Sequence, residues 1–173
     1  MNFSLFSRKI REMKKVMVFG TFDGLHSGHR NFFAQAAKFG NVVAVIARDS
    51  NVKKLKRKLP LKNERSRLAK VACDKNVWKA LLGDREDFLK PVEKIQPDML
   101  ALGFDQKTFG IKTLQRELKK RNLAPQIFRL KSFQPKIFKS SLLRKKGFFC
   151  FAFFEWLPKI FIVMDSRVRW RYL

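Results

Sequence analysis

The chain has 173 residues and a formal net charge of +25, because 39 Lys and Arg residues stand against 14 Asp and Glu residues. Hydrophobic residues make up 46% of it, which is enough to bury a core and excludes disorder for the bulk of the chain. Two cysteines, Cys73 and Cys150, exclude a disulfide scaffold and predict a reducing, cytoplasmic setting. The basic excess indicates phosphate-bearing partners, which are nucleotides, nucleic acid or an anionic membrane surface.

The sequence divides into three parts. Residues 1–14 form a basic lead-in without the apolar run of a signal peptide, residues 15–146 form the domain, and residues 147–173 form an aromatic-rich tail. The tail is interrupted by a proline and two charged residues, and it is short for a membrane-spanning helix, which takes about 20 apolar residues. Contact of the tail with a membrane surface and packing of the tail onto the domain stay open as alternatives.

Runs typical of buried strands alternate with helical patterns along the domain. The predicted strands, in chain order, are 15–20, 41–47, 77–82, 98–102 and 126–130. The predicted helices are 27–39, 63–73, 84–95, 107–121 and 140–146, and a basic loop, KKLKRK at 53–58, follows the second strand. This alternation predicts an α/β fold with a doubly wound (Rossmann-like) five-stranded parallel sheet and helices on both faces. In such sheets ligands bind beyond the carboxyl ends of the strands, where the strand order reverses.

The segment GTFDGLHSGH, from Gly20 to His29, follows the first predicted strand and opens the first predicted helix. Its glycines let the backbone approach a ligand closely, and the free N–H groups of a first helical turn point at an anion. His26 and His29 are the two histidines of the chain, and their spacing projects them to the same side of a helix start. Two imidazoles placed in this way donate hydrogen bonds to phosphate oxygens as negative charge develops. The alternatives are a zinc site, for which no Cys or carboxylate pair has the expected spacing, and a turn with two exposed histidines.

Three further segments place polar residues at the same edge of the predicted sheet. The basic loop lies where it would reach a bound phosphate, although a charge run is usually a solvated surface. Asp105 follows the fourth predicted strand, where it is either a turn residue or a contact to a base or ribose. Ser140 and Ser141 open the last predicted helix, where they act as N-caps or hold phosphate oxygens together with Arg144.

These motifs resemble those of the cytidylyltransferase-like nucleotidylyltransferases, the HxGH superfamily. GTFDGLHSGH is similar to the family signature G-T-F-D-x-x-H-x-G-H. RDSNVKKLK at 48–56 lies where the family has a lysine-bearing loop, and LGFDQ at 102–106 and KSSLLR at 139–144 resemble its later motifs in the same order. The resemblance covers about residues 15–146.

The resemblance implies nucleotidyl transfer, in which a phosphate-bearing acceptor attacks the α-phosphorus of a nucleoside triphosphate and pyrophosphate leaves. It implies that the catalytic residues are His26, His29 and Lys53. The nucleotide would contact Gly20, Thr21, Phe22, His26, His29, Gly103, Asp105, Ser140, Ser141 and Arg144. The acceptor would contact Asp23, Asp49, Lys54, Lys56 and Arg65, of which Asp23 could instead cap the first helix or hold a water of a magnesium ion. No metal ligand is expected from the protein, because Mg²⁺ or another divalent cation would arrive with the nucleotide.

Two segments resemble particular members of the family and thereby indicate the acceptor. ARDSNVKK at 47–54 and LGFDQ are most similar to archaeal-type FAD synthases, which implies transfer of AMP from ATP to FMN. The alternative within the family is a glycerol-3-phosphate cytidylyltransferase, which would use CTP and shares the GTFD and HxGH elements. A non-catalytic RNA-binding module is the alternative from another class, although nucleic acid is not the expected partner. We further expect a homodimer.

Overall fold

The structure is a computed structural model that describes residues 14–104, 106 and 110–132. Asp105, Ser140, Ser141 and Arg144 lie outside the described residues, as do the predicted helix at 140–146 and the tail at 147–173.

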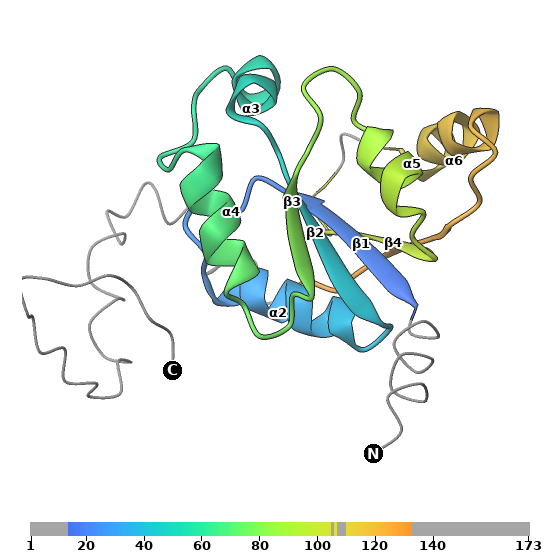
Figure 1. The fold of residues 1–173 in the computed structure, drawn as a ribbon, viewed down its shortest axis with the longest axis horizontal. Helices are drawn as coiled ribbons and strands as arrows, with labels where there is room; N and C mark the ends of the chain where they lie inside the picture. The colour runs from blue at the N-terminus through green and yellow to red at the C-terminus, as the bar shows by residue number, and fades with distance from the viewer. Residues whose placement is uncertain (1–13, 105, 107–109, 133–173) are drawn as a thin grey trace, which may run out of the picture.

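Five parallel strands form one sheet in the order β3-β2-β1-β4-β5 (Figure 1). They are β1 Lys15–Gly20, β2 Asn41–Ile46, β3 Lys79–Leu82, β4 Met99–Leu102 and β5 Gln126–Arg129. The central strands β1 and β2 are apolar on both faces, as strands of a doubly covered parallel sheet are. The strand order reverses between β1 and β4, so the loops that follow these two strands form the crevice where such sheets bind ligands.

Helices cover both faces of the sheet, which confirms the predicted doubly wound α/β class. They are α2 Ser27–Ala37, α3 Asp49–Lys56, α4 Glu64–Ala72, α5 Lys90–Ile95 and α6 Ile111–Lys120. Val16 and Val18 of β1 pack into a core with α2 and α4, whereas Met17 and Phe19 pack into a second core with α5 and α6 (Figure 1). Among the residues that the structure describes, no helix is long and apolar enough to cross a membrane.

Helix α3 corrects one prediction from the sequence. The sequence predicts a loop at the basic segment 53–58, but its first four residues form the second half of α3. The helix ends at Lys56, and Arg57 caps it with a φ of 54°. Only Val52 of this helix is buried, so the sequence lacks the apolar stripe that identifies a helix packed on a sheet. The helix stands beyond the carboxyl end of the sheet (Figure 1).

Helix α5 and strand β3 begin later than predicted. The expected helix at 84–95 begins only at Lys90, because the Asp84 carboxylate accepts hydrogen bonds from the N–H groups of Glu86 and Asp87 and closes a turn. Strand β3 begins at Lys79, although the N–H of Trp78 already donates to the carbonyl of Val42. The residues before α5 therefore form a loop at the carboxyl edge of the sheet.

Candidate active site

The turn between β1 and α2 folds back over the end of its own strand. Phe22 has a φ of 50° and Gly24 a φ of 67°, and the Phe22 ring packs against Phe33 at a centroid distance of 5.0 Å. A Cβ atom at Gly20 would lie only 2.6 Å from Cζ of this ring. Glycine at position 20 therefore allows the ring to close over the strand, which fixes the path of the chain into α2.

The two histidines stack on each other at the start of α2. His26 is the N-cap residue, with extended backbone. The rings of His26 and His29 lie 3.8 Å apart with an angle of 25° between their planes, and the Phe22 ring meets His29 edge-on at 5.4 Å. The Nδ1 atoms of both histidines are buried, so a ligand in the cavity does not reach them. The expectation that both rings project to the same side of the helix start agrees with this stacking.

Burial keeps the histidine pair neutral. It lowers the pKa of His26, and it lowers the pKa of His29 to about 3, with repulsion from His26 as the next cause. A hydrogen bond with the backbone of Gly24 acts in the opposite direction on His29, but it is the smaller influence. Two neutral imidazoles in an electropositive setting are suited to a phosphate ligand, whose negative charge raises the pKa values of both rings.

We expect His29 to stay neutral in the free protein from about pH 8 down to about pH 5. Because its pKa is lower in the folded chain, the unfolded chain takes up the proton first as the pH falls below about 6.5. The free energy of unfolding should therefore fall by up to about 2 kcal/mol between pH 6.5 and 5. NMR titration can resolve both rings, since the chain has 2 histidines. A midpoint near 6.5 for His29 would contradict this, and His29→Gln should flatten the pH dependence of stability.

Arg67 is a buried arginine that the sequence reasoning missed. It is 1% exposed on the inner side of α4, four residues before the buried Val71. Its guanidinium donates to the carbonyls of Thr21, Ala47 (2.7 Å) and Lys62 (3.0 Å), and to the carboxylate of Asp49 (2.8 Å). These acceptors belong to the β1–α2 turn, the end of β2, the segment before α4 and the start of α3. One side chain therefore holds together the loops that shape the site. In the sequence, the sign of this role is a charged residue on the apolar side of the helix.

Helices α3 and α4 cap each other at their first residues. The carboxylate of Glu64 accepts a hydrogen bond from the N–H of Asp49 (3.0 Å), and the carboxylate of Asp49 accepts one from the N–H of Glu64 (3.1 Å). Arg48 adds a 2.8 Å ion pair with Glu64. The hydrogen bond from Asp49 is the main cause that lowers the pKa of Glu64. The Asp49 carboxylate thus serves the contact between the two helices.

Gln106 joins the two sides of the crevice. Its side-chain amide donates to the carbonyl of Phe19 at the end of β1, and its side-chain oxygen accepts from the N–H of Gly103 after β4 (3.1 Å). Arg129 of β5 donates to the carbonyls of both Gly103 and Gln106 at 3.0 Å. The loop after β4 is therefore tied to β1 and β5.

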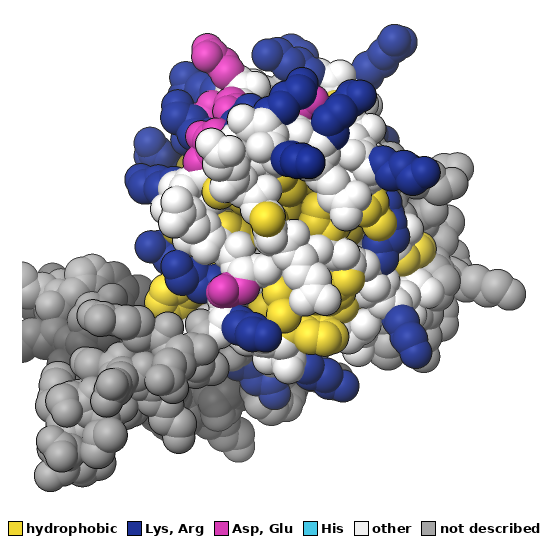
Figure 2. Space-filling model, turned by 90° about the vertical axis from the view of Figure 1, so that its right-hand side faces the viewer, with side chains coloured by type: hydrophobic (Ala, Val, Ile, Leu, Met, Phe, Trp, Pro, Cys, Tyr) yellow, Lys and Arg dark blue, Asp and Glu magenta, His cyan; other side chains and the backbone are white. Residues whose placement is uncertain are grey.

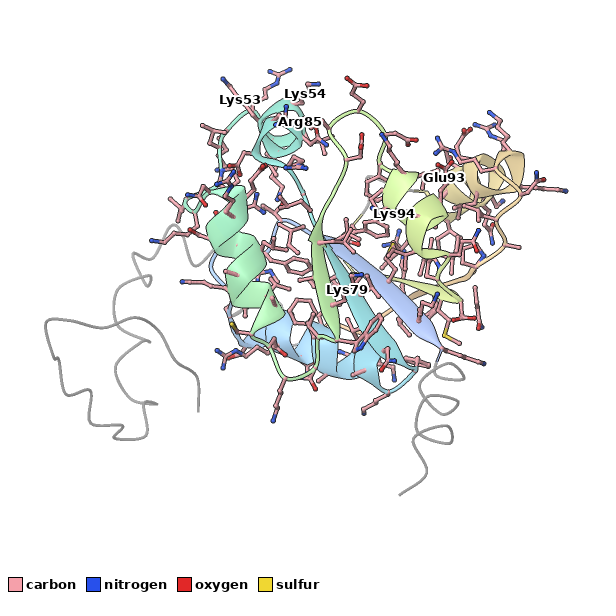
Figure 3. The ribbon with its side chains drawn as sticks, in the orientation of Figure 1. Lys53, Lys54, Lys79, Arg85, Glu93 and Lys94 are labelled. Atoms are coloured by element: carbon pink, nitrogen blue, oxygen red, sulfur yellow. The ribbon has the colours of Figure 1, made fainter. Side chains whose placement is uncertain are left out.

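The loop between β3 and α5 is also fixed in place. The Asn51 amide on α3 donates to the carbonyl of Asp84 (2.9 Å), and Arg121 at the end of α6 pairs with Asp87 (2.6 Å). The hydrogen bond from Arg121 lowers the pKa of Asp87. Arg85, between these two contacts, is thereby held at the carboxyl edge of the sheet (Figure 3).

These loops enclose a cavity of about 910 Å³ beyond the carboxyl ends of β1 to β4. Its lining contains six cations and three acids: Arg48, Lys54, Lys56, Lys58, Arg85 and Lys131, against Asp23, Asp84 and Glu86. The Asp23 carboxylate accepts hydrogen bonds from the N–H groups of Leu61 and Lys62, and Lys56 reaches Oγ1 of Thr21 at 3.1 Å. The lining is net positive, as a site for a polyphosphate must be.

The basic excess is not confined to the cavity. Figure 2 shows Lys and Arg side chains spread around the face on which α5 and α6 lie, with most of its Asp and Glu side chains toward the upper left. This wide distribution raises the potential around the molecule and favours the approach of anions to the cavity.

The structure brings most of the described predicted site residues into the cavity. Its lining includes Gly20, Thr21, Phe22, Asp23, His26, His29, Lys54 and Lys56, and Gly103 with its neighbour Phe104. Three predicted residues do not line it. Lys53 is exposed on α3 beside Lys54 (Figure 3), Arg65 is exposed on α4, and the Asp49 carboxylate is held by Arg67 and the N–H of Glu64.

Within the described ranges, no group of three or more His, Cys, Asp or Glu residues is placed to hold a metal ion. Asp23, which the sequence offered as a partner for a magnesium-bound water, holds two backbone N–H groups with its two oxygens.

Comparisons with known proteins agree with this geometry. The model of the cytidylyltransferase-like family matches residues 17–146. The chain is 43% identical over 121 residues to an FAD synthase of Ferroglobus placidus, which covers 69% of this chain and 78% of that protein. It is 45% identical over 122 residues to an FAD synthase of Methanothermus fervidus, and this match covers 68% of this chain and 83% of that protein. Among solved structures, the lipopolysaccharide core biosynthesis protein from Thermoplasma volcanium superimposes with a TM-score of 0.68 at 37% identity, over 70% of this chain and 99% of that chain.

Proposed function

The chain belongs to the cytidylyltransferase-like family, and we propose that its reaction is the transfer of AMP from ATP to FMN with release of pyrophosphate. As a member of this family with FAD synthases among its relatives, it is a nucleotidyltransferase enzyme. Three of these FAD synthases are 43% to 45% identical to the chain, and the chain matches 78% to 83% of their length. This likeness favours FMN over glycerol 3-phosphate as the acceptor.

The stacked histidine pair is the feature of the site that supports nucleotidyl transfer. His26 and His29 line the net positive cavity at the first turn of α2, beside the point where the strand order reverses. The N–H groups of this turn and the two imidazoles together favour the negative charge of a transferring phosphoryl group. Groups fixed before the reaction stabilise developing charge without reorganising, which is the largest catalytic contribution expected at such a site.

The reaction needs positioning more than covalent chemistry. A phosphate oxygen of FMN attacks the α-phosphorus of ATP in line, a new P–O–P bond forms, and the bond to the β-phosphate oxygen breaks as pyrophosphate leaves. The attacking phosphate is already ionised, so no general base is required. His26 and His29 stabilise the charge that builds on the α-phosphate oxygens.

The lysines of α3 hold the phosphates on the acceptor side. Lys56 reaches the same turn that carries the histidines, and Lys54 lines the cavity from the same helix. The resemblance gives Lys54 and Lys56 this role at the acceptor. The catalytic role that it gives to Lys53 stays a prediction, because Lys53 is exposed and does not line the cavity. Ser140, Ser141 and Arg144 remain proposed ligands of the β- and γ-phosphates.

Nucleotidyltransferases of this kind use a divalent cation with the nucleoside triphosphate, and we propose Mg²⁺ for this chain. When bound together with the triphosphate, such an ion would supply positive charge to the triphosphate and to the leaving pyrophosphate. The homodimer, the membrane contact of the tail and the cytoplasmic setting stay predictions.

The proposal is tested with a matrix of ATP and CTP against FMN, glycerol 3-phosphate, phosphocholine and phosphopantetheine. Pyrophosphate release should require ATP, FMN and a divalent cation, and should stop when EDTA removes the cation. FAD should appear in a 1:1 ratio to pyrophosphate by chromatography. Turnover of CTP with glycerol 3-phosphate, and none of ATP with FMN, would overturn the choice of substrates.

A further inference from the structure

Apolar side chains stand among the cations on one wall of the cavity. Leu55 and Leu59 both line it and are 66% and 56% exposed. Their sequence neighbours Lys54, Lys56 and Lys58 line it as well. Cations alone suffice to hold a triphosphate or a small sugar phosphate, so two large exposed leucines indicate a ligand that also has apolar surface to bury.

The floor of the cavity is apolar beneath this wall. Phe19, Val45 and Phe88 line it at the ends of the strands and on the loop before α5. The rings of Phe19 and Phe88 lie 4.4 Å apart and are tilted by 37°. These side chains belong to the packed core on the α5 and α6 face, so they form a firm apolar base for a ligand.

Donors for a polar ring edge lie on the same side of the cavity. Lys54 on α3 and Arg85 on the loop after β3 both line the cavity, and both stand above the carboxyl end of the sheet (Figure 3). An isoalloxazine ring has an apolar dimethylbenzene end and a pyrimidine end with two carbonyl acceptors. A wall that combines leucines with cations matches both ends of such a ring.

We propose that Leu55 and Leu59 form the subsite for the isoalloxazine ring of the acceptor. This inference rests on the proposed function, because it takes FMN as the acceptor. The FMN phosphate must reach the histidine pair, while the ribityl chain places the ring at a distance from it. Lys56 lies between the two leucines in the sequence and reaches Thr21 on the turn that carries the histidines, so one segment meets both ends of the acceptor.

The test compares three leucines that lie close together in the chain. Leu61 is 59% exposed, like the other two, but it does not line the cavity. The double variant Leu55→Ala/Leu59→Ala should weaken FMN binding at least about tenfold, measured by quenching of flavin fluorescence. Leu61→Ala should leave it unchanged. Because all three side chains are exposed, thermal melts of the variants should match that of the original chain.

Riboflavin and ribitol 5-phosphate separate the ring from the phosphate. Riboflavin should bind the original chain and lose affinity in the double variant, while ribitol 5-phosphate, a competitor without the ring, should bind both equally. The KM for FMN should rise in the double variant while the KM for ATP stays the same. If the original chain converts FMN to FAD and the double variant binds FMN equally well, the leucine subsite is wrong and the proposed function stands. If the original chain neither binds nor converts FMN, the proposed function fails, and the subsite fails with it.

Discussion

Replacing His29 by alanine is expected to lower the rate of pyrophosphate release from ATP and FMN by about 10²- to 10³-fold. The ring is held by stacking on His26 and by the edge of Phe22, and it lines the cavity where the α-phosphate would lie. An interaction that strengthens as the transition state forms affects kcat more than the KM for ATP. Steady-state kinetics of the purified variant, with FAD formation as a second readout, measures the loss.

The stacking of His26 on His29 predicts that substitutions of the two residues are not additive. Because the two rings act as one unit, His26→Ala should cause a comparable loss, and the double variant should lose much less than the product of the two single losses. Arg65→Ala is the matched control, because Arg65 is exposed on α4 and does not line the cavity. A His29→Ala rate within about threefold of the original would remove the histidine pair from the mechanism.

Replacing Arg67 by methionine is expected to lower the free energy of unfolding by about 3–5 kcal/mol. Methionine fills much of the same space but leaves the carbonyls of Thr21 and Ala47 and the carboxylate of Asp49 without the guanidinium that now satisfies them. Each buried acceptor that loses its partner costs about 1–3 kcal/mol. Urea unfolding monitored by circular dichroism measures the change, and an unchanged m-value would show that the folded state remains compact.

Two further variants identify the cause of this loss. Arg67→Lys should recover little stability, because an ammonium group lacks the planar fork that serves several acceptors at once. Arg65→Met, two residues earlier on the same helix, should change stability by less than about 0.5 kcal/mol. Equal effects at positions 65 and 67 would mean that the hydrogen-bond network around Arg67 contributes little.

The central strands and the histidine turn could be predicted from the sequence because their signals are local. β1 and β2 read as apolar runs bounded by glycine or polar residues, and GTFDGLHSGH occupies the strand–turn–helix position that was expected for it. Parallel strands with intervening helices allow few topologies, so the doubly wound class follows from the alternation, whereas the strand order, with its reversal at β1, comes from the structure.

The remaining parts depend on contacts between distant segments. α3 carries one buried residue and was taken for a loop, and its first residue is capped by Glu64 from the next helix. Arginine on a helix is usually exposed, so in the sequence only its position four residues before Val71 distinguishes Arg67 from Arg65. Gln106 acts through the carbonyl of Phe19, 87 residues away.

The tether through Gln106 has a mechanical consequence. Because the loop after β4 is joined to strands β1 and β5, this side of the cavity and the strand ends below it form a single stiff body. The opposite side is the stretch from Lys56 to Lys62, which is fastened near its ends by contacts with Thr21 and Asp23. The product is larger than either substrate, so its release requires room between these two sides. We expect substitutions that remove the contacts of this stretch with Thr21 or Asp23 to change the rate of product release.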